Sequence, residues 1–62
     1  MIKEKIEAMK AILEDANVNA VKFENGNKAA GTRLRKCMQD LKAKAQEVRL
    51  DVIDVKNELK TK

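Results

Sequence analysis

The chain has no histidine, proline, tryptophan or tyrosine, and only one cysteine and one phenylalanine among its 62 residues. A single cysteine cannot form a disulfide within the chain, and a tetrahedral zinc site needs four ligands that are usually cysteine or histidine. The absence of histidine also excludes acid–base catalysis by that residue. No pair of nucleophile and base stands out among the remaining side chains. We therefore expect a protein that is not an enzyme and uses neither a cofactor nor a small-molecule substrate.

Long hydrophobic runs are missing as well. Charged residues make up 39% of the chain, and no apolar run approaches the roughly 20 residues that a membrane helix requires. The first residues lack the pattern of a secretory signal, and a lone cysteine is compatible with a reducing compartment. We therefore expect a cytoplasmic location, or a viral particle if the source is a virus, and no membrane partner.

What the sequence does have is a heptad pattern in each half. Apolar residues recur at alternating spacings of four and three, which is typical of helices that pack on other helices. The first series consists of Ile2, Ile6, Met9, Leu13, Ala16, Ala20 and Phe23. The second series consists of Leu34, Met38, Leu41, Ala45, Val48, Val52, Val55 and Leu59.

Residues 25–27 separate the two series. Gly26 can adopt the positive φ that ends a helix, and Asn27 can cap the helix that follows. We therefore predict an all-α fold with a single domain over residues 1–62, an antiparallel two-helix hairpin. Its parts are a helix at about 2–24, a turn at 25–27 and a helix at about 28–60. Gly31, early in the second helix, allows either close packing or a flexible joint.

Self-association follows from the small size of such a hairpin. Ordering the chain costs about 1.5 kcal/mol per residue, and one helix–helix seam does not offset that cost. We therefore expect a homodimer that forms a four-helix bundle or a coiled-coil-like assembly. The residues expected in the oligomer core are Ile6, Met9, Leu13, Phe23, Leu34, Met38, Leu41, Val48, Val52, Val55 and Leu59.

The net charge of +4 is unevenly distributed, because residues 28–49 hold seven basic and two acidic side chains. Five basic residues recur every seven positions, at the e positions of the heptad on one flank of the second helix. This row, called the basic ridge below, consists of Lys28, Arg35, Lys42, Arg49 and Lys56. Charges at e positions ordinarily pair with acids on a neighbouring helix. A free row of this kind would instead attract phosphates, and the spacing leaves both interpretations open.

Aromatic residues do not alternate with the basic ones, and Phe23 belongs to the expected core. Binding to nucleic acid would therefore be directed at the backbone, sensitive to salt and weakly sequence-specific. Cys37, at a g position beside the core, is interpreted as a small buried side chain or, alternatively, as a disulfide partner across a dimer axis.

One segment also resembles a known family. It reads Gly26-Asn27-Lys28-Ala29-Ala30-Gly31-Thr32-Arg33-Leu34-Arg35-Lys36, and Met38-Gln39-Asp40-Leu41 and Ala45-Gln46-Glu47-Val48-Arg49 follow it. This pattern resembles the bacterial linker-histone-like nucleoid proteins, which carry a Gly-Asn-Lys-Ala-Ala core, a small residue, Arg-x-Arg and an amphipathic helix. The resemblance covers about residues 24–60.

The resemblance implies a chromatin-associated protein of the nucleoid that binds double-stranded DNA. The candidate nucleic-acid-binding residues are the motif's basic residues together with Lys42 of the ridge: Lys28, Arg33, Arg35, Lys36, Lys42 and Arg49. Family members that compact DNA bear a long tail rich in Lys, Ala and Pro, whereas this sequence stops at Lys62. We therefore expect a dimeric module with modest DNA affinity. The alternative is a structural helical bundle that binds another protein and no nucleic acid.

Overall fold

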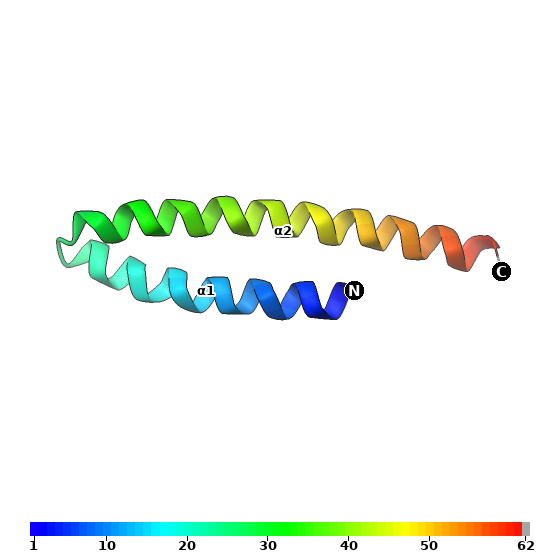
Figure 1. Ribbon diagram of the computed structural model, residues 1–62, viewed down its shortest axis with the longest axis horizontal. Coiled ribbons are helices and arrows are strands. Elements are labelled where there is room, and N and C mark those ends of the chain that lie inside the picture. Colours follow the sequence, from blue (N-terminus) through cyan, green and yellow to red (C-terminus); the bar gives the residue numbers. More distant parts are fainter. Residues whose placement is uncertain (62) are drawn as a thin grey trace.

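The computed structural model describes residues 1–61, with the side chains of residues 1–59, as two antiparallel α-helices. Helix α1 spans Ile2–Glu24 and helix α2 spans Lys28–Thr61. The helices lie side by side from the turn to the start of α1, and α2 then continues alone (Figure 1). The hairpin predicted from the heptad pattern is therefore confirmed. Neither helix, over the residues described, is long and apolar enough to cross a membrane.

The turn is built by the two residues on which its prediction rested. Gly26 has φ +101°, a conformation that side chains with a Cβ rarely adopt. The N–H of Gly26 donates to the carbonyl of Phe23 at 2.9 Å, and the N–H of Asn27 donates to the carbonyl of Lys22 at 3.0 Å. These two bonds form a Schellman motif that ends α1. The Asn27 Oδ1 then accepts a hydrogen bond from the N–H of Ala30 at 3.2 Å and caps α2.

Small side chains form the centre of the seam between the helices. Ala16, Ala30 and Cys37 are 4%, 0% and 7% exposed, and Asn19 is the buried polar residue at 4%. Side chains of this size let the two backbones approach closely, so the hairpin has no large, fully buried side chain in its described part. The interpretation of Cys37 as a small buried side chain agrees with this position.

The seam does not coincide with the predicted stripe of a and d positions, because it is rotated toward the g positions. Both helices face each other with their d and g positions, because Asn19, Ala30 and Cys37 are all g residues. Six residues of the predicted oligomer core are between 38% and 67% exposed in the single hairpin: Ile6, Leu13, Phe23, Met38, Val52 and Leu59. They are not part of the hairpin core, and their place in an oligomer core stays a prediction.

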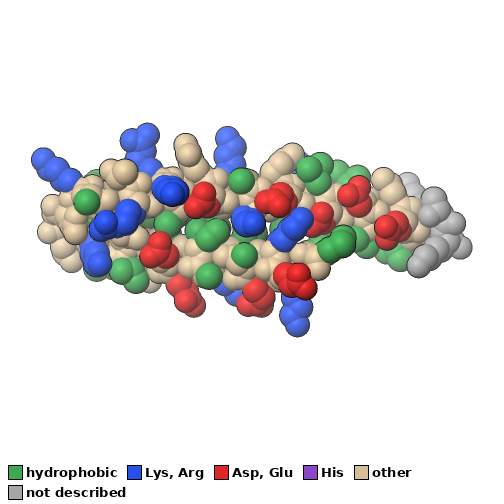
Figure 2. Space-filling view, viewed as in Figure 1, with side chains coloured by type: hydrophobic (Ala, Val, Ile, Leu, Met, Phe, Trp, Pro, Cys, Tyr) green, Lys and Arg blue, Asp and Glu red, His purple; other side chains and the backbone are tan. Residues whose placement is uncertain are grey.

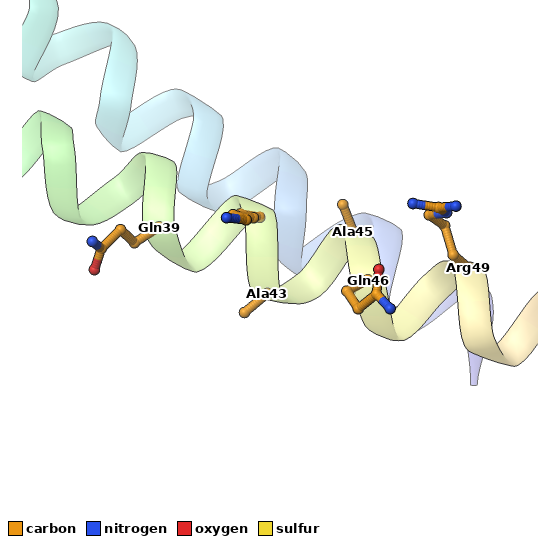
Figure 3. Close-up of a pocket in the computed structure, with 6 residues that line it drawn as sticks. Gln39, Ala43, Ala45, Gln46 and Arg49 are labelled. Atoms are coloured by element: carbon orange, nitrogen blue, oxygen red, sulfur yellow. The ribbon is translucent and has the colours of Figure 1, made fainter.

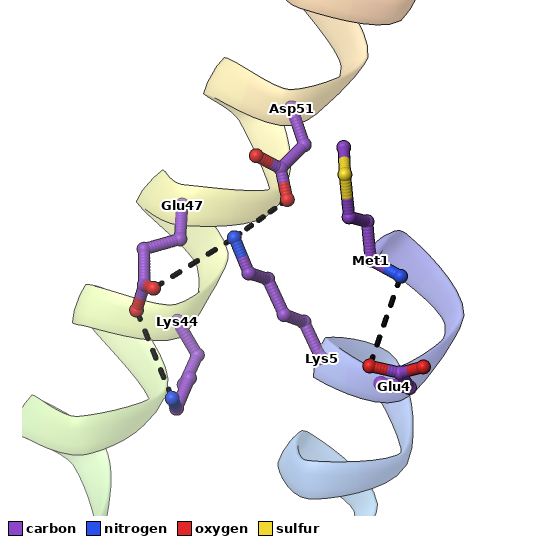
Figure 4. A network of polar contacts seen from close by, with 6 residues as sticks. All are labelled: Met1, Glu4, Lys5, Lys44, Glu47 and Asp51. Atoms are coloured by element: carbon purple, nitrogen blue, oxygen red, sulfur yellow. Dashed lines mark hydrogen bonds and ion pairs between the residues drawn. The ribbon is translucent and has the colours of Figure 1, made fainter.

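A charged contact joins the open end of the hairpin. Lys5 Nζ lies 2.6 Å from Asp51 Oδ2 and 3.8 Å from Glu47 Oε1, and Lys44 Nζ lies 3.8 Å from Glu47 Oε2 (Figure 4). The hydrogen bond to Asp51 raises the pKa of Lys5 above its ordinary value, so Lys5 keeps its charge through neutral pH and loses it only in strongly alkaline solution. The contact fixes which turn of α2 lies beside the start of α1.

A second polar contact crosses the seam nearer the turn. Arg33 Nε donates to Asn19 Oδ1 at 3.1 Å, and Asn19 Nδ2 donates to the backbone carbonyl of Asp15 at 3.0 Å. The buried amide of Asn19 is thus satisfied at both ends, which removes the cost of burying it. An amide that is satisfied only in this alignment disfavours sliding of one helix along the other.

Phe23 packs against the backbone of α2 at Gly31. A Cβ built on Gly31 would lie 2.6 Å from two carbons of the Phe23 ring, closer than real contacts allow. Gly31 therefore serves close packing, which is one of the two roles that its sequence position left open. The ring still has half of its surface exposed. The expectation that Phe23 lies in the core is not met within the hairpin, because α1 ends there and no further turn covers the ring.

The thiol of Cys37 is held in its protonated form. Burial raises the pKa of this thiol, and the carboxylate of Asp15, whose Oδ2 lies 3.5 Å from the sulfur, raises it further. We expect iodoacetamide at mildly alkaline pH to modify the native protein several-fold more slowly than the urea-unfolded chain. Asp15→Asn should speed the native reaction, and Glu14→Gln, at the neighbouring exposed position, should not. Equal rates in native and unfolded protein would contradict this account.

Candidate nucleic-acid interface

The hairpin has two different broad sides. Because antiparallel helices that meet through d and g positions turn their a positions to the same side, one side gathers exposed apolar residues. This apolar face consists of Ile6, Leu13, Met38, Val52 and Leu59. On the opposite side, acidic and basic side chains of both helices mingle along the seam (Figure 2).

The basic ridge lies on the outer flank of α2, beside the apolar face. All five of its side chains are exposed. Consecutive members are seven residues apart and therefore about 10.5 Å apart along the helix axis. Figure 2 shows Lys and Arg side chains projecting from the edge of α2 that faces away from α1, in the part nearer the turn. The ridge can therefore be reached by a large partner without moving α1.

The ridge cations are not used within the hairpin. Over the described residues, the ion pairs involve the N-terminus, Lys5, Lys10 and Lys44, and none involves a member of the ridge. The flank of α2 that carries the ridge is turned away from the acids of α1. The sequence left open whether the ridge pairs with acids on a neighbouring helix or attracts phosphates. Within this hairpin the ridge forms no ion pair over the described residues, so its five charges are available to a partner.

A shallow hollow lies between two ridge residues on the outward side of α2. It is lined by Gln39, Lys42, Ala43, Ala45, Gln46 and Arg49 (Figure 3). The small side chains of Ala43 and Ala45 leave room between Lys42 and Arg49 for an anionic group. The amides of Gln39 and Gln46 add hydrogen-bond donors that the sequence analysis did not single out. The sequence signal for these two glutamines is their separation of seven residues, which places both on the strip of α2 next to the ridge.

The six candidate residues do not share one surface. Lys28, Arg35, Lys42 and Arg49 belong to the ridge, whereas Lys36 lies further around the exposed outer side of α2. Arg33 lies on the opposite flank, where its Nε is engaged by Asn19 at 3.1 Å. The motif Arg-x-Arg thus sends its two guanidinium groups to opposite flanks of the helix, because residues two apart on a helix do not face the same way.

The arrangement suits electrostatic binding. Point charges of Lys and the forked guanidinium groups of Arg attract and orient phosphate oxygens. The hollow between Lys42 and Arg49 is lined by no aromatic side chain on which a base could stack. The aromatic ring of Phe23 stands apart from the middle of the ridge, near the turn, where a smaller hollow is lined by Phe23, Lys28, Gly31, Thr32, Leu34 and Arg35.

Comparison with known proteins identifies a family. The family model of the Histone H1-like protein Hc1 matches residues 3–58, which is most of the chain. The searches of curated proteins and of solved structures returned no match. Because the family model covers both helices and the turn between them, the chain belongs to the Histone H1-like protein Hc1 family.

Proposed function

We propose that this protein binds double-stranded DNA without sequence specificity and associates with the nucleoid, using the basic ridge of α2 to contact phosphates. Family membership supports a DNA-binding, nucleoid-associated role in general. The single observation that carries the finer proposal is the row of five exposed cations that have no ion-pair partner among the described residues.

The proposed contacts run along α2 from the turn. Lys28, Arg35, Lys42 and Arg49 contact phosphates directly, and Lys36 adds charge beside them. Arg33 contributes through its terminal nitrogens, since only its Nε is bound to Asn19. Each neutralised phosphate releases condensed counterions, so the affinity depends steeply on salt and little on base sequence.

We also propose that the protein acts as a homodimer. The single hairpin exposes 5214 Å², whereas a compact 7.0 kDa protein exposes about 4,000 Å² by the usual size scaling. The difference, on the order of 1,000 Å², is comparable to the area that one partner buries in a standard interface. Packing of two apolar faces in a four-helix bundle would remove this excess and leave the ridges at the edges.

The experiment that tests DNA binding is a gel shift with two duplexes of unrelated sequence. We expect the protein to bind the two duplexes with equal affinity at about 50 mM salt. Raising the salt concentration to about 200 mM should lower both affinities at least tenfold. Preference for one duplex, or retention that does not change with salt, would contradict phosphate-directed binding.

The second candidate function is a protein-interaction module, which the exposed apolar face favours. On that reading the apolar face binds another protein and the ridge only keeps the hairpin in solution. It predicts no retention of duplex DNA at physiological salt, together with capture of an acidic protein free of nucleic acid. The same gel shift therefore separates the two functions.

A further inference from the structure

The hairpin leaves one aromatic ring half uncovered beside its turn. Phe23 is the only aromatic residue of the chain, and it is 50% exposed. One side of its ring lies against Gly31 of α2, where a Cβ would come within 2.6 Å of two ring carbons. The ring also borders the turn hollow, the name used below for the small hollow lined by Phe23, Lys28, Gly31, Thr32, Leu34 and Arg35. A ring held on one side and open on the other offers a surface on which a planar group can stack.

Two cations of the basic ridge lie on either side of this ring. Gly31, against which the ring packs, comes three residues after Lys28 and four residues before Arg35. The two cations are therefore about 10.5 Å apart along the helix axis, with the ring at a level between them. Neither takes part in an ion pair over the described residues. The ring is thus placed between two positive charges that a ligand can use.

The other residues of the turn hollow suit the same kind of ligand. Thr32 is exposed and adds a hydroxyl that can donate or accept a hydrogen bond. None of the six lining residues is acidic, and Glu24, the neighbour of Phe23 in the sequence, is exposed and not among them. An aromatic ring combined with nearby cations is the arrangement by which proteins hold single-stranded nucleic acid, because the ring stacks on a base while the cations neutralise the backbone.

We propose that the turn hollow binds one unpaired base of a DNA strand, stacked on the Phe23 ring, while Lys28 and Arg35 contact the phosphates on either side of that nucleotide. A paired base lies inside the duplex stack and cannot reach the ring. The turn hollow therefore adds affinity only where a base is bulged, frayed or single-stranded. Every base has a face that can stack, so the preference is for unpaired structure and not for sequence. The inference rests on the proposed function, because cations of the same ridge hold the phosphates.

Three duplexes that differ at one position test the inference. The first is fully paired, the second carries one bulged adenine, and the third carries the same bulge without its base. In fluorescence anisotropy at low salt we expect the adenine bulge to bind at least about fivefold more tightly than the abasic bulge, because stacking on an aromatic side chain contributes that factor or more. Equal affinities for these two bulges would overturn the inference and leave the proposed function standing. Failure to bind any of the three duplexes would contradict both.

A variant without the ring separates stacking from attraction by charge. Phe23→Leu keeps the net charge and an apolar side chain beside Gly31, so it should bind the paired duplex as the wild type does and lose the preference for the adenine bulge. The matched control is Val21→Ala, because Val21 is 55% exposed on α1 and does not line the turn hollow. This control should keep the preference. A Phe23→Leu protein that is helical by circular dichroism and still prefers the adenine bulge would overturn the inference.

A measurement on the unaltered chain does not depend on how the variant folds. Because the chain has no other aromatic residue, isotopically labelled phenylalanine gives aromatic NMR signals from Phe23 alone. Stacking against a base should shift these signals upfield in the complex with the adenine bulge and not in the complex with the abasic bulge. Ring signals that stay unchanged when the adenine bulge is bound would overturn the inference.

Discussion

Replacing Ala30 by leucine is expected to disrupt the hairpin. Ala30 is fully buried, and its N–H donates a hydrogen bond to Oδ1 of Asn27, the residue that caps α2, at 3.2 Å. Leucine adds three carbons at a position of the seam that has no exposed surface. Overpacking of a tight site typically costs 1–3 kcal/mol. In a domain of this size a loss of about 2 kcal/mol lowers the Tm by roughly 10 °C.

The control for this variant is the neighbouring residue. Ala29 is exposed on α2, so Ala29→Leu adds the same carbons to solvent with almost no change in helix propensity. Thermal unfolding followed by far-UV circular dichroism compares the two. If Ala30→Leu melts at the same temperature as Ala29→Leu, the seam does not lie where the structure places it.

Reversing two charges of the basic ridge is expected to have the largest effect on DNA binding. Arg35→Glu combined with Lys42→Glu removes two neighbouring phosphate contacts and adds two repulsive charges about 10.5 Å apart. Both residues are exposed, and neither takes part in an ion pair within the described part of the chain, so the fold should be unaffected. We expect duplex affinity at low salt to fall at least 100-fold, measured by fluorescence anisotropy.

A control variant with two reversed charges on α1 separates the effect of where the charge lies from the effect of the net charge. Lys3→Glu combined with Lys22→Glu changes the net charge equally, and both lysines are exposed on α1 away from the ridge. Long-range attraction falls by the same amount in both variants, but only the ridge variant loses direct contacts. A similar loss of affinity in both would mean that net charge, and not the ridge, is responsible for binding.

The fold follows from local sequence signals to a large extent. The alternating spacings of four and three predict two helices, and Gly26 and Asn27 predict the turn because each residue type suits one backbone position. The ridge is predicted as well, since a spacing of seven on a helix fixes a shared flank wherever the partner helix lies. These features depend on residues close in sequence, which is why they could be read without a structure.

The position of the seam could not be predicted in the same way. The apolar stripe of each helix is wide, so several rotations of the pair bury similar apolar area. The outcome is determined by contacts between residues far apart in sequence. These are the burial of Ala16 and Ala30, and the pairs formed by Lys5 with Asp51 and by Asn19 with Arg33. A prediction of the seam from the spacing of large apolar residues ignores polar and small side chains. It therefore left out Asn19, which is buried in the hairpin, while the predicted place of Leu13 and Met38 in an oligomer core remains untested.

The separation of Arg33 from the ridge has a similar origin. The family motif groups Arg33 and Arg35 by sequence, whereas the helix separates them by nearly half a turn. The contact of Arg33 with Asn19 then gives that arginine a structural role, because it satisfies a buried amide. Its contribution to DNA binding is therefore expected to be smaller than that of Arg35.

The salt dependence of duplex binding tests the central claim most directly. The logarithm of the association constant is measured against the logarithm of salt concentration for wild type and for the Arg35→Glu, Lys42→Glu variant. Each phosphate contact contributes about −0.9 to the slope, so the variant's slope should be shallower by about 2. Equal slopes for the two proteins would contradict the claim that the basic ridge of α2 binds the DNA backbone.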